Sequence, residues 1–122
     1  MSFCLILIEK LKKNILFICS QNKLRSPTAE QIYSTREDLN VLSAGLNNDA
    51  ENPVSVDLLT WADSIYVMEK AHLNRLRKKF GEYLKNQKLV SLDIPDIYEF
   101  MEPSLIEELA KKLRRFIGNP ND

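Results

Sequence analysis

The sequence predicts a three-layer α/β fold, in which a four-stranded parallel sheet is flanked by helices. Two observations support this prediction. Short apolar segments alternate four times with patterns of helical spacing, and such alternation is typical of parallel strands joined by crossover helices. The first apolar segment also has no polar alternation after its first residue, which indicates a strand that is buried on both faces.

Four segments have the length and composition of strands. The first spans 14–19 and runs into a polar loop, and the second spans 40–44 and is stopped by Gly45. The third, 64–68, is rich in residues that favour strands, and the fourth spans 88–92. Ligands of such sheets bind at the carboxyl ends of the strands, where the strand order reverses. The loop after the first strand is therefore the expected place for a site.

Helix signals fill the stretches between these strands. Ser26 and Pro27 are expected to open the first helix, as its N-cap and first helical residue. Pro53 is expected to open a short second helix before the third strand. Gly81 is expected to end a third helix, whose apolar residues Leu73, Leu76 and Phe80 recur at helical spacing.

The last helix follows the fourth strand. Pro103 and Ser104 are expected at its start, and Glu107 stands three residues after Ser104, in the register of a capping box. Apolar residues then repeat on one side of this helix at Leu105, Leu109, Leu113 and Phe116. This stripe predicts a helix that packs one face against the sheet.

The overall composition limits the possible functions. A chain of 122 residues suffices for one domain, and 17 Lys and Arg against 17 Asp and Glu give a net charge of zero. Zero net charge argues against a general binder of nucleic acid or anionic membranes. The longest apolar run, 3–8, is far shorter than the ~20 residues that span a bilayer. We therefore expect a cytoplasmic monomer or weak homodimer, with one domain over 14–122 and an N-terminal tail, 1–13, of unassigned role.

The two cysteines, Cys4 and Cys19, cannot form a disulfide framework and fit a reducing compartment. Cys19 ends the first strand, and Arg25 and Ser26 follow six and seven residues later. Backbone N–H groups of a short loop that enters a helix can cradle an anion and favour the thiolate form of a cysteine at its base. The planar guanidinium of Arg25 can bind two phosphate oxygens, and Ser26 can donate a hydrogen bond to the sulfur. This pattern predicts cleavage of phosphate monoesters.

At these residues the chain resembles the low-molecular-weight protein tyrosine phosphatases, whose phosphate loop has the form Cys-x4-Cys-Arg-Ser followed by Pro. The resemblance covers about 14–117, and its fold, a flavodoxin-like sandwich around a four-stranded parallel sheet, is the one predicted above. It rests on three segments: Asn14 to Glu30, Ser43-Ala44-Gly45, and Ala62 to Met68 with the acid that follows.

The resemblance implies that Cys19 attacks phosphorus, that Arg25 binds the phosphoryl group, and that water then hydrolyses a phosphocysteine. No metal and no cofactor is implied, and the partner is a protein that carries phosphotyrosine. Asn22 matches a loop residue that hydrogen-bonds a serine, here Ser43, and holds the loop open. The phosphate-binding loop is made of Ser20, Gln21, Asn22, Lys23, Leu24 and Ser26.

The resemblance also implies a general acid after the fourth strand, where the family has an Asp-Pro-Tyr segment. Asp96 aligns best, with Pro95 before it and Tyr98 in the position of the family's tyrosine, which is expected to contact substrate. Asp93 is the second choice, because it directly follows the fourth strand.

Several residues depart from the family pattern. Leu24 replaces the second cysteine of the loop, so reversible protection by a disulfide is not expected. Gln21 replaces a glycine, and Ile97 replaces the proline of Asp-Pro-Tyr. Trp61 lies in a helical pattern and is expected in the core rather than against a substrate.

Other interpretations remain open. An arsenate reductase would need further cysteines, and a phosphocarrier would not need Arg25. A third alternative is a module that binds phosphoproteins without turnover, which Gln21 and Ile97 leave possible. His72, the one histidine, is expected in a surface or capping role rather than at a metal. A basic stretch, 70–88, precedes an acidic one, 93–108, and such runs are usually solvated faces.

Overall fold

The computed structural model describes residues 12–122. Its centre is a sheet of four parallel strands, with β1 (Lys13–Cys19) and β3 (Ser64–Val67) in the middle and β2 (Leu39–Gly45) and β4 (Lys88–Ser91) at the edges. The strand order is β2-β1-β3-β4, so the chain steps from β1 to one side and then crosses to the other. The predicted fold class is confirmed. Most of the proposed tail, including Cys4, lies outside the described residues.

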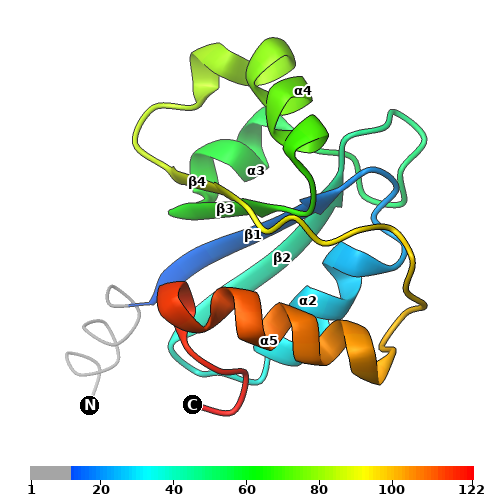
Figure 1. The fold of residues 1–122 in the computed structure, drawn as a ribbon. Helices are drawn as coiled ribbons and strands as arrows, with labels where there is room; N and C mark the ends of the chain where they lie inside the picture. Colours follow the sequence, from blue (N-terminus) through cyan, green and yellow to red (C-terminus); the bar gives the residue numbers. More distant parts are fainter. Residues whose placement is uncertain (1–11) are drawn as a thin grey trace, which may run out of the picture.

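Helices cover both faces of this sheet (Figure 1). Helices α2 (Arg25–Tyr33) and α5 (Pro103–Ile117) lie on one face, and α3 (Val56–Trp61) and α4 (Lys70–Phe80) lie on the other, followed by a 3-10 turn, η1 (Gly81–Tyr83). Within residues 12–122, no helix combines the length and the apolar character that crossing a membrane requires.

Strand β1 supplies side chains to two separate cores, because successive residues of a strand point to opposite faces. Ile15, Phe17 and Cys19 face α2 and α5, whereas Leu16 and Ile18 face α3 and α4. This explains the continuous apolar run in the sequence. Trp61 packs against the second core, as expected.

Two predicted helix starts are wrong in detail. Helix α2 begins at Arg25, because Ser26 turns its hydroxyl inward rather than capping the helix. Helix α3 begins three residues after Pro53, with Ser55 as N-cap, whose Oγ accepts from the backbone N–H of Leu58. Pro53 instead pairs with Gly45 in an isolated bridge, which holds the β2–α3 loop against the sheet.

The last helix begins at Pro103 as predicted, but its N-cap is Glu102 and no side chain caps its first turn. The expected capping box of Ser104 and Glu107 is therefore absent. Gly81 follows the last residue of α4, as predicted. A capping box is present at the start of α4 instead, where Glu69 and His72 each accept a hydrogen bond from the other's backbone N–H. Both residues also contact the candidate site.

Candidate active site

The predicted site lies in the loop between β1 and α2, at the carboxyl edge of the sheet and beside the point where the strand order reverses. A small cavity of about 110 Å³ opens there. Its lining includes most of the predicted site residues: Cys19, Ser20, Gln21, Lys23, Leu24, Arg25 and Asp96. Larger cavities lie elsewhere on the surface, but this one holds the predicted nucleophile.

The sulfur of Cys19 lies at the base of this cavity and is buried. It accepts a hydrogen bond of 3.2 Å from the backbone N–H of Asn22, and it lies 2.9 Å from Oγ of Ser26. Both contacts suit a sulfur that carries negative charge, because each partner can donate a hydrogen bond to it. The loop therefore surrounds Cys19 with donors before any ligand enters.

Asn22 organises this loop through its backbone and its amide. Its φ of 57° lies in the left-handed region, which asparagine tolerates better than most residues. Its Nδ2 donates to Oγ of Ser26 at 3.0 Å and to Oγ of Ser43 at 2.9 Å. Ser43 in turn donates to Oε1 of Glu30 at 2.5 Å. Because Ser26 already accepts from Asn22, its own proton is available for the sulfur of Cys19.

Arg25 is buried at the start of α2, with 4% of its side chain exposed. Its Nη1 donates to Oε2 of Glu69 at 2.6 Å and to the carbonyl oxygen of Ile94 at 2.8 Å. These two partners lie in the segments that follow β3 and β4, and they fix one side of the guanidinium. The other edge carries Nε, which lies 3.7 Å from Oδ1 of Asp96. Arg25 can therefore present this edge to a bound anion.

The two candidate acids have different surroundings. Asp96 lines the cavity and faces Arg25, although 64% of its side chain is exposed. Asp93 has a positive φ of 55°, accepts a hydrogen bond from Oγ of Ser91, and does not line the cavity. The structure thus brings Asp96, the first choice, to Cys19 and leaves Asp93 apart.

Tyr98 was expected to contact substrate, but it does not line the cavity. Its ring is half-buried and packs against the core on the α2 and α5 side. Large apolar side chains from the same segment are exposed instead: 73% of Ile97 and 47% of Phe100.

His72 is buried and touches the loop, which sequence reasoning missed. Its Nδ1 accepts from the backbone N–H of Glu69 at 3.1 Å, so the proton of the neutral ring lies on Nε2. Nε2 lies 2.8 Å from Oγ of Ser20 and therefore donates to it. Burial, aided by the charge of Arg25, lowers the pKa of His72 to about 4. In this tautomer His72 cannot take a proton from Ser20, so the pair is not a serine nucleophile with its base.

Glu69 and Glu30 are the other contributors that residue patterns did not assign. Glu69 lies two residues after the end of β3, and ligands of parallel sheets bind at the carboxyl ends of the strands. Its position in the sequence therefore indicated that it could belong to the site. Glu30 lies on α2, and nothing in the neighbouring sequence indicates that it accepts a hydrogen bond from Ser43. Within residues 12–122, His, Cys, Asp and Glu side chains form no group of three that could hold a metal ion.

No protein-family model and no curated protein sequence matches the chain. Solved structures do match its fold. The tyrosine phosphatase Wzb from Escherichia coli K30, in complex with phosphate, is 21% identical, with a TM-score of 0.68 over 86% of this chain and 96% of that one. The YwlE arginine phosphatase from Geobacillus stearothermophilus is 21% identical, with a TM-score of 0.61 over 85% and 94%.

A third solved structure is the low molecular weight protein tyrosine phosphatase SP-PTP from Streptococcus pyogenes. It is 15% identical, with a TM-score of 0.64 over 85% of this chain and 87% of that one. Each of the three matches covers 85% or 86% of this chain. The chain therefore has the fold of the low-molecular-weight protein tyrosine phosphatases.

Proposed function

We propose that this protein is a cysteine-dependent phosphatase that hydrolyses phosphotyrosine in proteins through a phosphocysteine intermediate. One observation carries the proposal: Cys19, Arg25 and Asp96 converge on one small cavity. A nucleophile, an anion-binding fork and a carboxyl group are the three parts that cleavage of a phosphate monoester needs.

In the first step, the thiolate of Cys19 attacks phosphorus and an S–P bond forms as the P–O bond to the leaving group breaks. Asp96, in its protonated form, gives its proton to the leaving oxygen. Arg25 and the backbone N–H groups of the loop bind the phosphoryl oxygens while charge shifts onto them. Glu69 and the carbonyl of Ile94 keep the guanidinium in place.

In the second step, water attacks the phosphocysteine and the S–P bond breaks. The Asp96 carboxylate left by the first step takes a proton from this water, so the acid is restored. The sulfur leaves as a thiolate, and the donors around it, the N–H of Asn22 and the hydroxyl of Ser26, stabilise the returning charge.

The surroundings of Asp96 support an aryl ester as substrate. Ile97 and Phe100 follow Asp96 by one and four residues and expose apolar surface in the segment that carries this acid. An aromatic ring that carries the phosphate can bury against such side chains. Lys23, exposed on the other part of the lining, adds positive charge that attracts a dianion.

The test compares wild type with Cys19→Ala, Asp96→Asn and Asp93→Asn on a phosphotyrosine peptide and on p-nitrophenyl phosphate. Cys19→Ala should abolish turnover of both. Asp96→Asn should slow transfer of the phosphoryl group to Cys19 by about 10²–10⁴-fold for the peptide, and much less for the nitrophenyl ester, because its leaving group needs no proton. Steady turnover of both substrates should be slow, because hydrolysis of the phosphocysteine also needs Asp96. Asp93→Asn is the matched control and should behave like wild type.

Other results would change the proposal. Equal activity of wild type and Cys19→Ala would exclude the phosphocysteine mechanism. Tight binding of phosphate without turnover would favour a phosphoprotein-binding module. Hydrolysis of phosphoarginine but not of phosphotyrosine would retain the mechanism and replace the substrate. If Asp93→Asn lost activity while Asp96→Asn behaved like wild type, Asp93 rather than Asp96 would be the general acid.

A further inference from the structure

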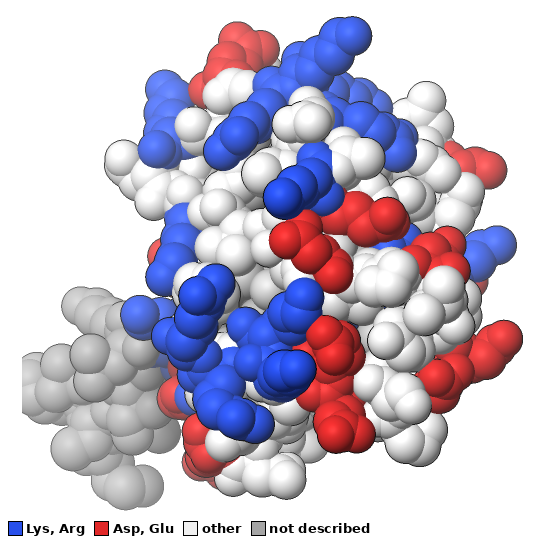
Figure 2. All heavy atoms as spheres, viewed as in Figure 1, with Lys and Arg blue, Asp and Glu red and all other residues white. Residues whose placement is uncertain are grey.

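A second feature of the surface is the basic face of α4. Figure 2 shows Lys and Arg side chains gathered over this helix, apart from a second group over the end of α5. A cavity of about 660 Å³ lies between α4 and the β2–α3 loop. We call it the basic pocket; it is lined by Leu46, Asn47, Asn48, Arg75, Lys78 and Lys79.

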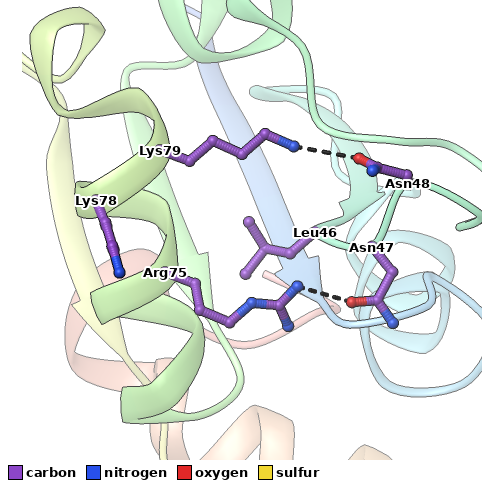
Figure 3. A pocket seen from close by; sticks show the side chains of 6 residues that line it. All are labelled: Leu46, Asn47, Asn48, Arg75, Lys78 and Lys79. Atoms are coloured by element: carbon purple, nitrogen blue, oxygen red, sulfur yellow. Dashed lines mark hydrogen bonds between the residues drawn. The ribbon is translucent and has the colours of Figure 1, made fainter.

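Two cations of the basic pocket, Arg75 and Lys79, have neutral hydrogen-bond partners. Nη2 of Arg75 donates to Oδ1 of Asn47 at 2.8 Å, and Nζ of Lys79 donates to Oδ1 of Asn48 at 3.2 Å. Figure 3 shows both side chains reaching across to the loop, with Leu46 between them. The lining contains no Asp or Glu. The lining therefore contains three cationic residues and no carboxylate, although the whole chain has zero net charge, and Arg75 and Lys79 are the two that reach across to the loop.

The basic pocket is joined directly to the loop between β1 and α2 that holds Cys19, which we call the catalytic loop after its proposed role. The backbone N–H of Asn47 donates to the carbonyl oxygen of Ser20 at 3.0 Å, and the N–H of Leu46 donates to that of Cys19 at 2.9 Å. Asn47 thus binds the catalytic loop through its backbone N–H, and it binds Arg75 through its side-chain oxygen. The charge of Arg75 also contributes to the lowered pKa of His72, which touches Ser20.

The spacing of the basic residues along α4 sets the length of peptide that would reach them. Arg75 and Lys79 lie three and seven residues after His72, which is about 4.5 Å and 10.5 Å along the helix axis. An extended peptide advances about 3.3 Å per residue. A substrate chain that runs along α4 from His72, the partner of Ser20, therefore reaches Arg75 and Lys79 within about two to four residues.

We propose that the basic pocket binds acidic side chains that lie two to four residues from the phosphorylated residue of a protein substrate. This inference rests on the proposed function and specifies its substrate class. A carboxylate bonds Arg75 more strongly than the neutral amide of Asn47 does, because both partners are then charged. Lys78 and Lys79 add attraction that steers an acidic segment toward the loop.

The experiment compares two phosphotyrosine peptides of equal length, one with Glu and one with Gln at the positions two to four residues from the phosphotyrosine on either side. Wild type should show a kcat/KM about tenfold higher for the Glu peptide at low salt. This ratio should fall toward one as ionic strength rises, since the charges are exposed. The triple variant Arg75→Gln, Lys78→Gln, Lys79→Gln should show a ratio near one at all salt concentrations.

A matched control carries the same change of charge elsewhere. Lys111→Gln, Arg114→Gln, Arg115→Gln removes three exposed cations of α5, which line a different cavity, and should keep the wild-type ratio. A wild-type ratio near one, or an unchanged ratio in the α4 variant, would overturn the inference.

The inference and the proposed function can fail separately. If wild type hydrolyses neither peptide, the phosphatase proposal fails, and binding is then measured by fluorescence anisotropy of the same two peptides. Preferential binding of the Glu peptide by wild type, lost in the α4 variant alone, would still support the basic pocket. Equal binding of both peptides would overturn it.

Discussion

Nε2 of His72 donates a hydrogen bond of 2.8 Å to Oγ of Ser20, the residue that follows the proposed nucleophile. The direction of this bond is fixed by the backbone of Glu69, which donates to the other ring nitrogen. Ser20 lines the cavity, and with His72 as its donor it keeps its own proton for another acceptor. A phosphoryl oxygen bound in the loop is such an acceptor.

Loss of this contact should weaken catalysis without abolishing it. We expect His72→Ala and Ser20→Ala each to lower kcat/KM for p-nitrophenyl phosphate by about tenfold, the value of one hydrogen bond. The double variant should be no worse than either single one, because both changes remove the same interaction. Steady-state kinetics of the four proteins measure this. Fully additive losses would show that the two residues act independently.

The protonation of His72 should make stability depend on pH. Its pKa falls from 6.5 to about 4 in the fold, mainly by burial and then by the charge of Arg25; Arg75 acts in the same direction, and Glu69 and Asp96 oppose it. Between these pH values the unfolded chain binds a proton that the folded chain does not, so stability falls as pH falls. The loss should reach about 3 kcal/mol at pH 4.

Urea unfolding of wild type and of His72→Gln at several pH values isolates this contribution, since the carboxylates titrate in both proteins. Wild type should lose stability more steeply than the variant between pH 6.5 and 4. If the stability of both proteins fell equally with pH, the fold would tolerate the protonated ring of His72 at no cost in stability, which would contradict the prediction.

Two substitutions of Asn22 separate its backbone role from its amide role. Asn22→Gly keeps access to the positive φ but removes the hydrogen bonds to Ser26 and Ser43, and should cost about 1–2 kcal/mol of stability. Asn22→Ala loses both features and should cost about 1 kcal/mol more. Denaturant unfolding measures the difference. Equal stability of the two variants would exclude backbone strain as a factor.

Gly45 should tolerate no side chain. A Cβ there would lie 2.6 Å from Cβ of Ala50, 2.7 Å from the carbonyl oxygen of Ser20 and 3.0 Å from the backbone N of Asn22. Gly45→Ala should therefore cost about 1–3 kcal/mol and lower activity, because the catalytic loop must move. Gly81→Ala is the control, since its Cβ would meet nothing within 4 Å. Similar unfolding of both variants would contradict this account.

Local patterns were enough to predict the sheet. Strand β1 is a continuous apolar run because both faces are covered, and its end places Cys19 where the strand order reverses. The Asn22–Ser43 contact, expected from family resemblance, is present at 2.9 Å. The catalytic roles of these residues stay predictions.

Long-range contacts explain what the patterns missed. Serine is a residue type that often caps helices, but the hydroxyl of Ser26 bonds the sulfur of Cys19 and the amide of Asn22 instead of the first turn of α2. Glu69 and His72 become part of the site only because β3 ends beside β1, a relationship between segments more than forty residues apart in sequence. Tyr98 has the sequence position of the family's tyrosine and packs its ring on the core, and its contact with substrate stays a prediction.

The phosphocysteine on Cys19 is the central claim, and it can be trapped. In Asp96→Asn, p-nitrophenyl phosphate should still phosphorylate Cys19, whereas hydrolysis should stall because no carboxylate takes the proton of water. Rapid mixing should then show a burst of nitrophenol equal to the enzyme concentration, and mass spectrometry should find one phosphoryl group on the peptide that contains Cys19. A phosphoryl group on another residue, or steady turnover in Cys19→Ala, would contradict the account.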